Sequence, residues 1–321
     1  MHPKALQRLV VRKTGNGRSP SSGLCAPLER CSTRSHAGAW ERSYAGLPPG
    51  PAAPLWRSYR YDAAGNLQDA IARKSAGLTT DNRLRVWQDL RFDYDPWGNV
   101  SAKRKGAAQI QHFHYDDEDR LVAVRTENPY GVSDTTFAYD ALGRRSTRTC
   151  STLPAGSAET LIEQRRYVWS GMRMLQDIGA NQLTTYIYDP DQDYVPLARL
   201  DHARHADGSL AGEPRCYWFH TDQLGTPLEL TDETGNTVWA GRHKAWGRLD
   251  GIAPATGAIE QPLRFQGQYA DASTGLHYNT FRYYDPDVGR FCSHDPIGIA
   301  GGENLYAYAP NPTGWVDPWG W

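Results

Sequence analysis

A short motif that recurs four times limits what this chain can fold into. Each copy reads aromatic-x-Tyr-Asp, and in three copies the third residue after the Asp is Gly. The copies occupy residues 59–67, 92–100, 113–121 and 137–145, and weaker relatives follow at 186–190, 217–225 and 283–291. A repeated unit must be interpreted before single residues, because every copy describes the same structural element.

Each part of the motif has a physical explanation. Aromatic side chains at alternate positions indicate a β-strand with one buried face. The Asp side chain can accept backbone N–H groups in an Asx-type turn, and Gly permits the positive φ that a chain reversal needs. One hairpin is marginal in water, so neighbouring hairpins must stack. The repeats therefore predict an all-β fold, a curved strip of antiparallel β-hairpins.

Composition supports this fold and excludes several classes of function. The chain has 18 Tyr, 11 Trp, 31 Gly and 21 Pro, which favours short strands and tight turns. Its 35 basic and 36 acidic residues leave almost no net charge, so we expect no nucleic acid partner. We also expect no membrane span and no signal peptide, because every apolar stretch is too short.

The cysteines and histidines do not indicate a metal site. The five cysteines are widely spaced and form no C-x-x-C pair, which is typical of free thiols in a reducing compartment. The pairs His112 with His114 and His202 with His205 each lack a third ligand at suitable spacing. The prediction is no metal and no cofactor.

The chain divides into three predicted segments. Residues 1–54 are basic, rich in Ser, Gly, Pro and Ala, and end in L-P-P-G-P-A-A-P, which is typical of a disordered leader and linker. Residues 55–262 carry the repeats. Residues 263–321 form a C-terminal region that contains two boxes of the form D-P-x-G-x, at 295–299 and 317–321.

These motifs resemble the YD repeats of the Rhs family of bacterial polymorphic toxins, whose relatives include the C components of insecticidal toxin complexes and, more distantly, teneurins. The most specific stretches are H-T-D-Q-L-G-T-P at 220–227 and the two runs at 267–291 and 293–312, which are similar to the Rhs core-associated region. The resemblance implies a hollow shell of β-hairpins that encapsulates a toxin segment. It also implies that residues 263–321 seal the shell as a plug.

The resemblance implies an autoproteolytic role for the two boxes. In the family, an aspartic-type protease cuts just after the second box, so the catalytic pair would be Asp295 and Asp317 and the cleavage position would be Trp321. Two carboxylates that share a site do not both ionise easily, so one would hold a proton while the other activates water. We expect Arg290 to pair with one carboxylate or to stabilise the oxyanion. The boxes read D-P-I-G-I and D-P-W-G-W, so Ile299 and Trp321 replace the usual Leu.

Simpler interpretations of the same residues stay open. Asp-Pro-x-Gly is also an ordinary β-turn sequence. Ser293, His294 and Asp295 combine three residue types of a catalytic triad, but consecutive strand residues point to opposite faces of a sheet. The abundant Tyr and Trp residues suit carbohydrate rings, although an aromatic residue in every strand is more often part of a core.

We expect the chain to be a C-terminal shell fragment of an Rhs-type toxin whose toxin segment is absent from this sequence, with no independent enzymatic turnover. The alternatives are an autoprotease that acts in cis in a longer parent, and a carbohydrate-binding, adhesin-like repeat protein. The expected partners are a C-terminal toxin segment or an upstream shell portion, and spike components of a type VI secretion system. The expected location is the bacterial cytoplasm before secretion as part of a larger effector.

Overall fold

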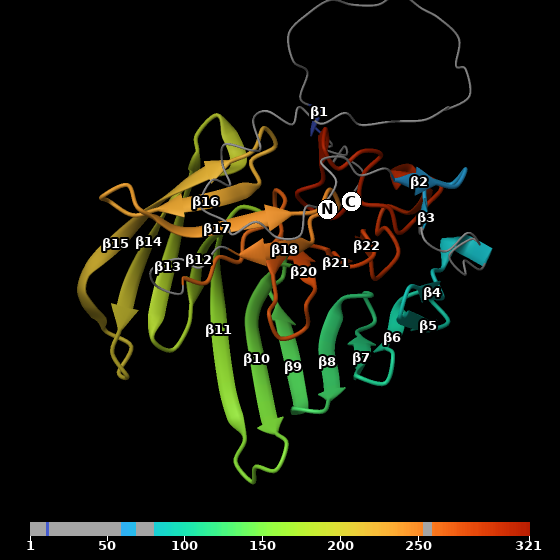
Figure 1. The fold of residues 1–321 in the computed structure, drawn as a ribbon, viewed down its shortest axis with the longest axis horizontal. Coiled ribbons are helices and arrows are strands. Elements are labelled where there is room, and N and C mark those ends of the chain that lie inside the picture. Colours follow the sequence, from blue (N-terminus) through green and yellow to red (C-terminus); the bar gives the residue numbers. More distant parts are fainter. Residues whose placement is uncertain (1–10, 13–58, 69–79, 253–258) are drawn as a thin grey trace, which may run out of the picture.

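The computed structural model describes residues 11–12, 59–68, 80–252 and 259–321, and these are organised almost wholly as β-strands (Figure 1). The helical elements within these ranges are two 3-10 turns, η1 (Thr80–Asn82) and η2 (Gly298–Gly301). The predicted leader at 1–54 lies outside the described residues except for β1 (Val11–Arg12), which pairs with β23 (Trp315–Val316). No helix within the described ranges has the length and hydrophobicity needed to cross a bilayer.

Fifteen strands form one antiparallel sheet in which every strand pairs with its neighbours in sequence. They are β4 (Val86–Trp87), β5 (Leu90–Tyr94), β6 (Val100–Lys105), β7 (Gln109–Tyr115), β8 (Leu121–Asn128), β9 (Gly131–Tyr139), β10 (Arg145–Pro154), β11 (Leu161–Ser170), β12 (Arg173–Ile178), β13 (Gln182–Asp189), β14 (Gln192–Arg204), β15 (Leu210–Thr221), β16 (Pro227–Thr231), β17 (Thr237–His243) and β18 (Leu249–Ile252). The sheet bends around the rest of the molecule (Figure 1). This arrangement confirms the predicted curved strip of hairpins.

The turns between strands have the predicted chemistry. In all four copies of the motif the Asp side chain accepts a hydrogen bond from the backbone N–H four residues later, at Asp62, Asp95, Asp116 and Asp140. The third copy has Asp119 where the others have Gly, and Asp119 itself adopts φ 58°. Gly98 has φ +95°, which strongly favours Gly, and a Cβ at this position would lie 2.4 Å from the His294 ring, so that ring would have to shift.

The C-terminal region lies inside the bend of the long sheet (Figure 1). Its own four-stranded sheet consists of β19 (Tyr269–Ala270), β20 (His277–Asn279), β21 (Arg282–Asp285) and β22 (Arg290–Phe291). A further hairpin is formed by β2 (Arg60–Tyr61) and β3 (Leu67–Gln68). All residues of β20, β21 and β22 are buried, because these strands are enclosed by the long sheet.

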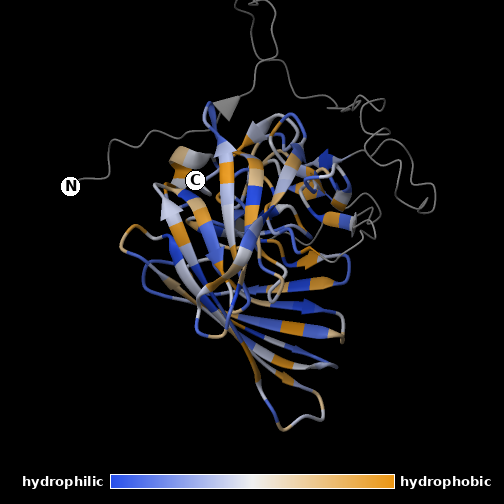
Figure 2. Cartoon of the chain, turned by 90° about the vertical axis from the view of Figure 1, so that its left-hand side faces the viewer, coloured by the Kyte–Doolittle hydropathy of each residue, from blue (hydrophilic) through white to orange (hydrophobic). Residues whose placement is uncertain are grey.

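The hydrophobic core forms between the long sheet and the C-terminal region. Alternating apolar positions along the strands are visible in Figure 2, and three buried clusters each combine side chains from residues before 250 with side chains from 263–309. The repeat aromatics Phe92, Phe113 and Phe137 pack with Tyr278 and Tyr283 in the first of these clusters. Burying one aromatic side chain stabilises the fold by about 1.5–3 kcal/mol. The repeat aromatics are therefore core residues.

Buried ion pairs fix the C-terminal region on the sheet. Lys103 of β6 donates to Asp285 of β21 at 2.7 Å, and Arg145 of β10 contacts Asp271 at 3.1 Å. Arg145 is fully buried, and its guanidinium lies 4.5 Å from the ring centre of Tyr278. These contacts set the position of β20 and β21, and so of every side chain that they carry, relative to the repeats.

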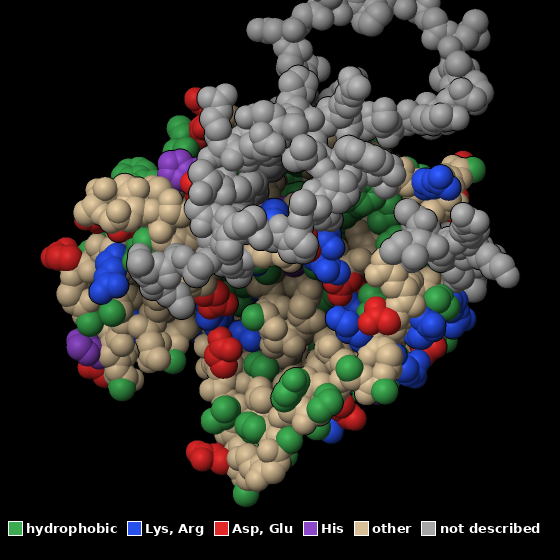
Figure 3. Space-filling model, in the orientation of Figure 1, with side chains coloured by type: hydrophobic (Ala, Val, Ile, Leu, Met, Phe, Trp, Pro, Cys, Tyr) green, Lys and Arg blue, Asp and Glu red, His purple; other side chains and the backbone are tan. Residues whose placement is uncertain are grey.

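The inner face of the long sheet is covered only in part. The ends of β9, β10 and β11 project beyond the C-terminal region (Figure 1). Along the inner face of β11 the exposed fraction rises from 6% at Tyr167 through 22% and 50% for the side chains of Arg165 and Glu163 to 58% at Leu161. Figure 3 shows basic and acidic side chains interspersed over this side of the molecule, without a large patch of one sign.

Candidate active site

The structure brings the two D-P-x-G-x boxes together at one buried arginine. Asp295 follows β22, Asp317 follows β23, and both are at least nine-tenths buried. The Nη2 atom of Arg282 in β21 lies 3.3 Å from Oδ2 of Asp295 and 3.8 Å from Oδ2 of Asp317. The predicted carboxylate pair therefore converges on one guanidinium, although 22 positions separate the two residues in sequence.

Arg282 is held by the backbone around it. Its Nε atom donates to the Gly320 carbonyl at 2.6 Å, and Nη1 donates to the Leu305 carbonyl at 3.0 Å. The guanidinium also lies 3.6 Å from the ring centre of Phe291, an arrangement that favours a cation. A guanidinium fixed on several sides holds both boxes in one geometry.

The two carboxylates of this site differ in their surroundings. Oδ1 of Asp317 accepts hydrogen bonds from the backbone N–H groups of Gly320 and Trp321 at 2.9 and 3.0 Å, whereas Oδ2 is buried without a hydrogen bond. The pKa of Asp317 is raised to about 6, chiefly by burial; Arg282 and the two backbone donors lower it, and the Asp295 carboxylate adds to the rise. Asp295 accepts the Ile297 N–H on Oδ1 at 3.0 Å and contacts Arg282 more closely through Oδ2.

The second box is fixed along its whole length. Asn279 donates to the Asp317 carbonyl at 3.0 Å, and the Phe281 N–H donates to the Trp319 carbonyl at 3.1 Å. The Trp321 ring stacks on Phe281 with the ring centres 5.0 Å apart. The backbone of the box thus lies along the turn between β20 and β21, close to both carboxylates.

Arg290 does not take the place that the sequence predicted for it. Its Nη2 atom donates to the Asn82 carbonyl at 2.6 Å, and its guanidinium lies 4.6 Å from the ring centre of Tyr306. Arg282 makes the contacts to the carboxylates instead. Sequence reasoning overlooked Arg282 because both arginines occur in aromatic strand segments. One sequence feature could have identified Arg282. It directly precedes Tyr283 and Tyr284 in a strand segment without a polar face, so its charge would need a buried partner.

The other residues considered from the sequence do not form a second site. The Nε2 atom of His294 is buried without a hydrogen bond, and the ring packs against Tyr306 with the ring centres 4.9 Å apart. Across the described part of the chain, no group of three or more His, Cys, Asp and Glu side chains is arranged to hold a metal ion. The chemistry that this structure gathers is therefore that of Asp295, Asp317 and Arg282.

Comparison of the sequence with known proteins points to one family. A family model described as RHS protein matches residues 216–250. The chain is 50% identical over 273 residues to double-stranded DNA deaminase toxin A of Burkholderia cenocepacia (strain H111), covering 83% of this chain and 19% of that protein. It is 32% identical over 318 residues to toxin protein Tse5 of Pseudomonas aeruginosa, covering 82% of this chain and 23% of that protein.

Among solved structures, the crystal structure of TcdB2-TccC3 aligns with a TM-score of 0.62 at 20% identity, covering 86% of this chain and 14% of that one. That similarity supports the β-strip fold. The chain spans about a fifth of the length of the curated relatives it matches.

Proposed function

Because the chain belongs to the Rhs family, we propose that it forms the C-terminal part of a β-shell that encloses a polypeptide segment. Two of its relatives are named as toxins, and both are several times longer than the matched region. The enclosed segment would be the toxin portion of a larger effector, and the remaining partners would be upstream shell repeats and components of a secretion apparatus. In this proposal residues 55–262 form shell and residues 263–321 form the plug inside it.

The uncovered inner face of the long sheet carries this proposal. The exposed fraction along β11 rises from Tyr167 to Leu161, so the concave face continues beyond the C-terminal region. Leu161 is apolar and more than half exposed on that face. An open concave face with both charged and apolar side chains suits an unfolded polypeptide of mixed composition. For the carbohydrate-binding alternative, the buried repeat aromatics Phe92, Phe113 and Phe137 offer no binding platform, whereas Trp97 and Trp218 are exposed.

Site-specific photocrosslinking tests the enclosure. The chain is extended after Trp321 by a polypeptide segment, and a photoreactive amino acid replaces Glu163 on the inner face. The matched control carries it in place of the neighbouring Gln164, which points to the opposite face. We expect crosslinks to the added segment from position 163 and few from position 164. Equal yields at both positions would contradict enclosure.

A second function, cleavage in cis after Trp321, is favoured by the cluster of Asp295, Asp317 and Arg282. With a pKa of about 6, Asp317 holds a proton over much of the acidic range, and its Oδ2 has no other hydrogen-bond partner. That oxygen would donate to the carbonyl oxygen of Trp321, while Asp295 would take a proton from the attacking water. The water oxygen bonds to the carbonyl carbon, and the C–N bond after Trp321 then breaks. The leaving amine takes the proton held by Asp295, and the new carboxyl group returns a proton to Asp317.

A reporter sequence fused after Trp321 tests this function. We expect time-dependent release of the reporter, abolished in Asp295→Asn and Asp317→Asn, with an unchanged rate in the control Asp232→Asn. Asp232 is a half-buried turn residue that also accepts backbone N–H groups, so it matches the chemistry of a box without lying in the cluster. A fusion that stays intact under folding conditions would leave the shell role as the sole function.

A further inference from the structure

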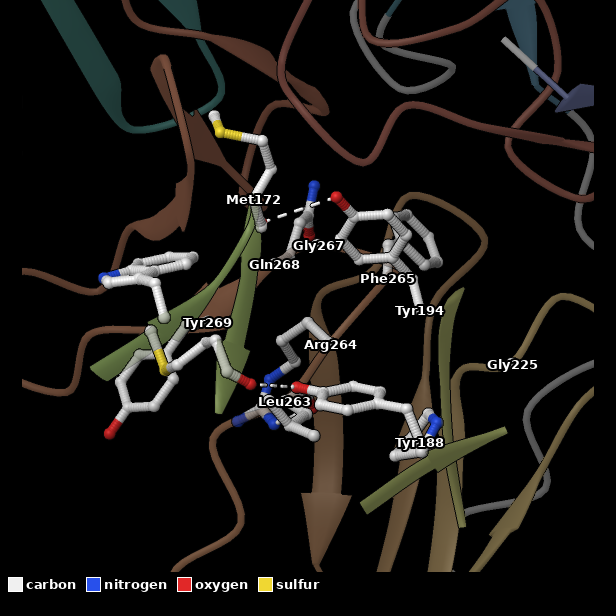
Figure 4. A pocket seen from close by; sticks show the side chains of 13 residues that line it. Met172, Tyr188, Tyr194, Gly225, Leu263, Arg264, Phe265, Gly267, Gln268 and Tyr269 are labelled. Atoms are coloured by element: carbon white, nitrogen blue, oxygen red, sulfur yellow. Dashed lines mark hydrogen bonds between the residues drawn. The ribbon is translucent and has the colours of Figure 1, made fainter. Parts of the chain in front are cut away.

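The side chain of Trp319 in the second box reaches the repeat sheet. Its indole Nε1–H donates to the hydroxyl of Tyr194 in β14 at 2.5 Å. The same hydroxyl donates to the carbonyl of Met172, in the turn between β11 and β12, at 3.4 Å (Figure 4). One tyrosine hydroxyl therefore links the second box to two separate parts of the long sheet.

The backbone of the box approaches the C-terminal region closely beside this contact. Gly267 has φ +79°, and a Cβ there would lie 2.0 Å from the carbonyl oxygen of Pro318. Tyr194, Met172 and Gly267 all line one small cavity of about 30 Å³, which also borders Tyr188 (Figure 4). Because the cavity is so small, the groups that line it have little room to move.

We propose that Tyr194, held by the Met172 carbonyl, forms a subsite for the side chain of residue 319, two positions before Trp321, while Gly267 leaves room for the backbone of residue 318. Through this subsite the repeat sheet sets the register of the box in front of Asp295 and Asp317. The inference rests on the proposed cleavage after Trp321 and deepens it. Tyr194 is then a positioning residue, and the shell repeats help to select which peptide bond is cut.

The chemistry of the contact explains why an indole suits the subsite. A half-buried N–H donor needs an acceptor, and the Tyr194 hydroxyl provides one while its own proton goes to Met172. Phenylalanine at position 319 would keep an aromatic ring at this position and lose the donor. Small displacements of a reacting group are costly, so a box that slips in register would present the wrong peptide bond.

Four variants of the reporter fusion test the subsite. Tyr194→Phe and Trp319→Phe each remove one partner of the hydrogen bond, and the double variant removes both. The matched control is Tyr188→Phe, because the Tyr188 hydroxyl lines the same cavity but donates to the Met174 carbonyl at 2.9 Å, whereas the Trp319 indole donates to Tyr194. Loss of one neutral hydrogen bond should slow release by about 2- to 12-fold in each single variant. The double variant should be no slower than the slower single variant.

A second readout needs no cleavage by the chain itself. Carboxypeptidase removes Trp321 from the unextended chain only when the second box detaches from the sheet. Measuring the intact mass over time therefore reports how often the box detaches. Tyr194→Phe should accelerate this removal by the same factor of about 2 to 12, and Tyr188→Phe should not.

The outcomes of the two assays test the subsite and the proposed cleavage independently. Equal effects of Tyr194→Phe and Tyr188→Phe in both assays would overturn the subsite, because the hydroxyl would then only support the cavity. Additive slowing in the double variant would also overturn it. If the parent fusion never releases its reporter while Tyr194→Phe still accelerates carboxypeptidase digestion, the subsite stands as an anchor and the proposed cleavage fails.

Discussion

The raised pKa of Asp317 predicts a specific pH dependence of stability. Burial raises this pKa from 3.8 to about 6, so the folded chain binds the proton more tightly than the unfolded chain does. That difference corresponds to about 3 kcal/mol of unfolding free energy. The stabilisation is fully present below about pH 3.8 and is lost as the pH rises through about 6. Ionised Asp317 thus destabilises the fold at neutral pH.

Replacing Asp317 by Asn isolates this effect from all other titrating groups. The amide keeps the shape and can still accept the Gly320 and Trp321 N–H groups on its oxygen, but it does not titrate. We expect the stability of the parent relative to Asp317→Asn to fall by about 2.4 kcal/mol between pH 3.8 and pH 6.5, most steeply near pH 5. Urea unfolding followed by tryptophan fluorescence at closely spaced pH values measures the difference.

A turn aspartate provides a control of opposite sign. Asp140 is partly buried, which raises its pKa, but hydrogen bonds from the Arg144 side chain and backbone outweigh burial and hold the pKa below its usual value. Its contribution is present above that usual value and is lost as the pH falls. A flat difference curve for Asp317→Asn, or one that rises with pH as expected for Asp140→Asn, would refute the assignment of a raised pKa to Asp317.

Three further predictions concern the contacts that hold the site. Arg282→Gln should destabilise the chain by about 3–5 kcal/mol in urea unfolding, because it leaves two buried carboxylates without a cation, and Arg282→Lys should cost less. Gly267→Ala should cost at least about 1 kcal/mol from its left-handed backbone and should speed carboxypeptidase removal of Trp321, since the new methyl group meets the second box. Lys103→Met should cost about 3–5 kcal/mol, and adding Asp285→Asn should recover a large part of that loss; simple additivity of the two changes would contradict a buried pair.

The sequence was informative wherever structure depends on neighbouring residues. Asp62, Asp95, Asp116 and Asp140 form the predicted turns, because an Asx turn involves only the Asp and the four residues after it. The alternation of aromatic residues predicted the strands, and the close spacing of the motif copies predicted an antiparallel strip. Neither pattern contains the number of strands that the C-terminal region covers.

The candidate site shows where sequence reasoning stopped. The D-P-x-G-x boxes identified Asp295 and Asp317 as a possible pair, and the structure places them at one guanidinium. In the structure Arg282 faces the carboxylates, whereas the predicted Arg290 donates to the Asn82 carbonyl. The contact of Trp319 with Tyr194 had no sequence signal at all, since 125 positions separate the two residues.

By itself, the sequence determined the class of fold, the turn geometry and the residue types of the site, because these depend on interactions within a few residues. Only the tertiary structure decided which arginine meets Asp295 and Asp317, why the pKa of Asp317 rises, and which part of the sheet holds Trp319. Each of these depends on how the C-terminal region packs inside the curved sheet. That packing follows from core contacts between residues more than a hundred positions apart, which no local pattern encodes.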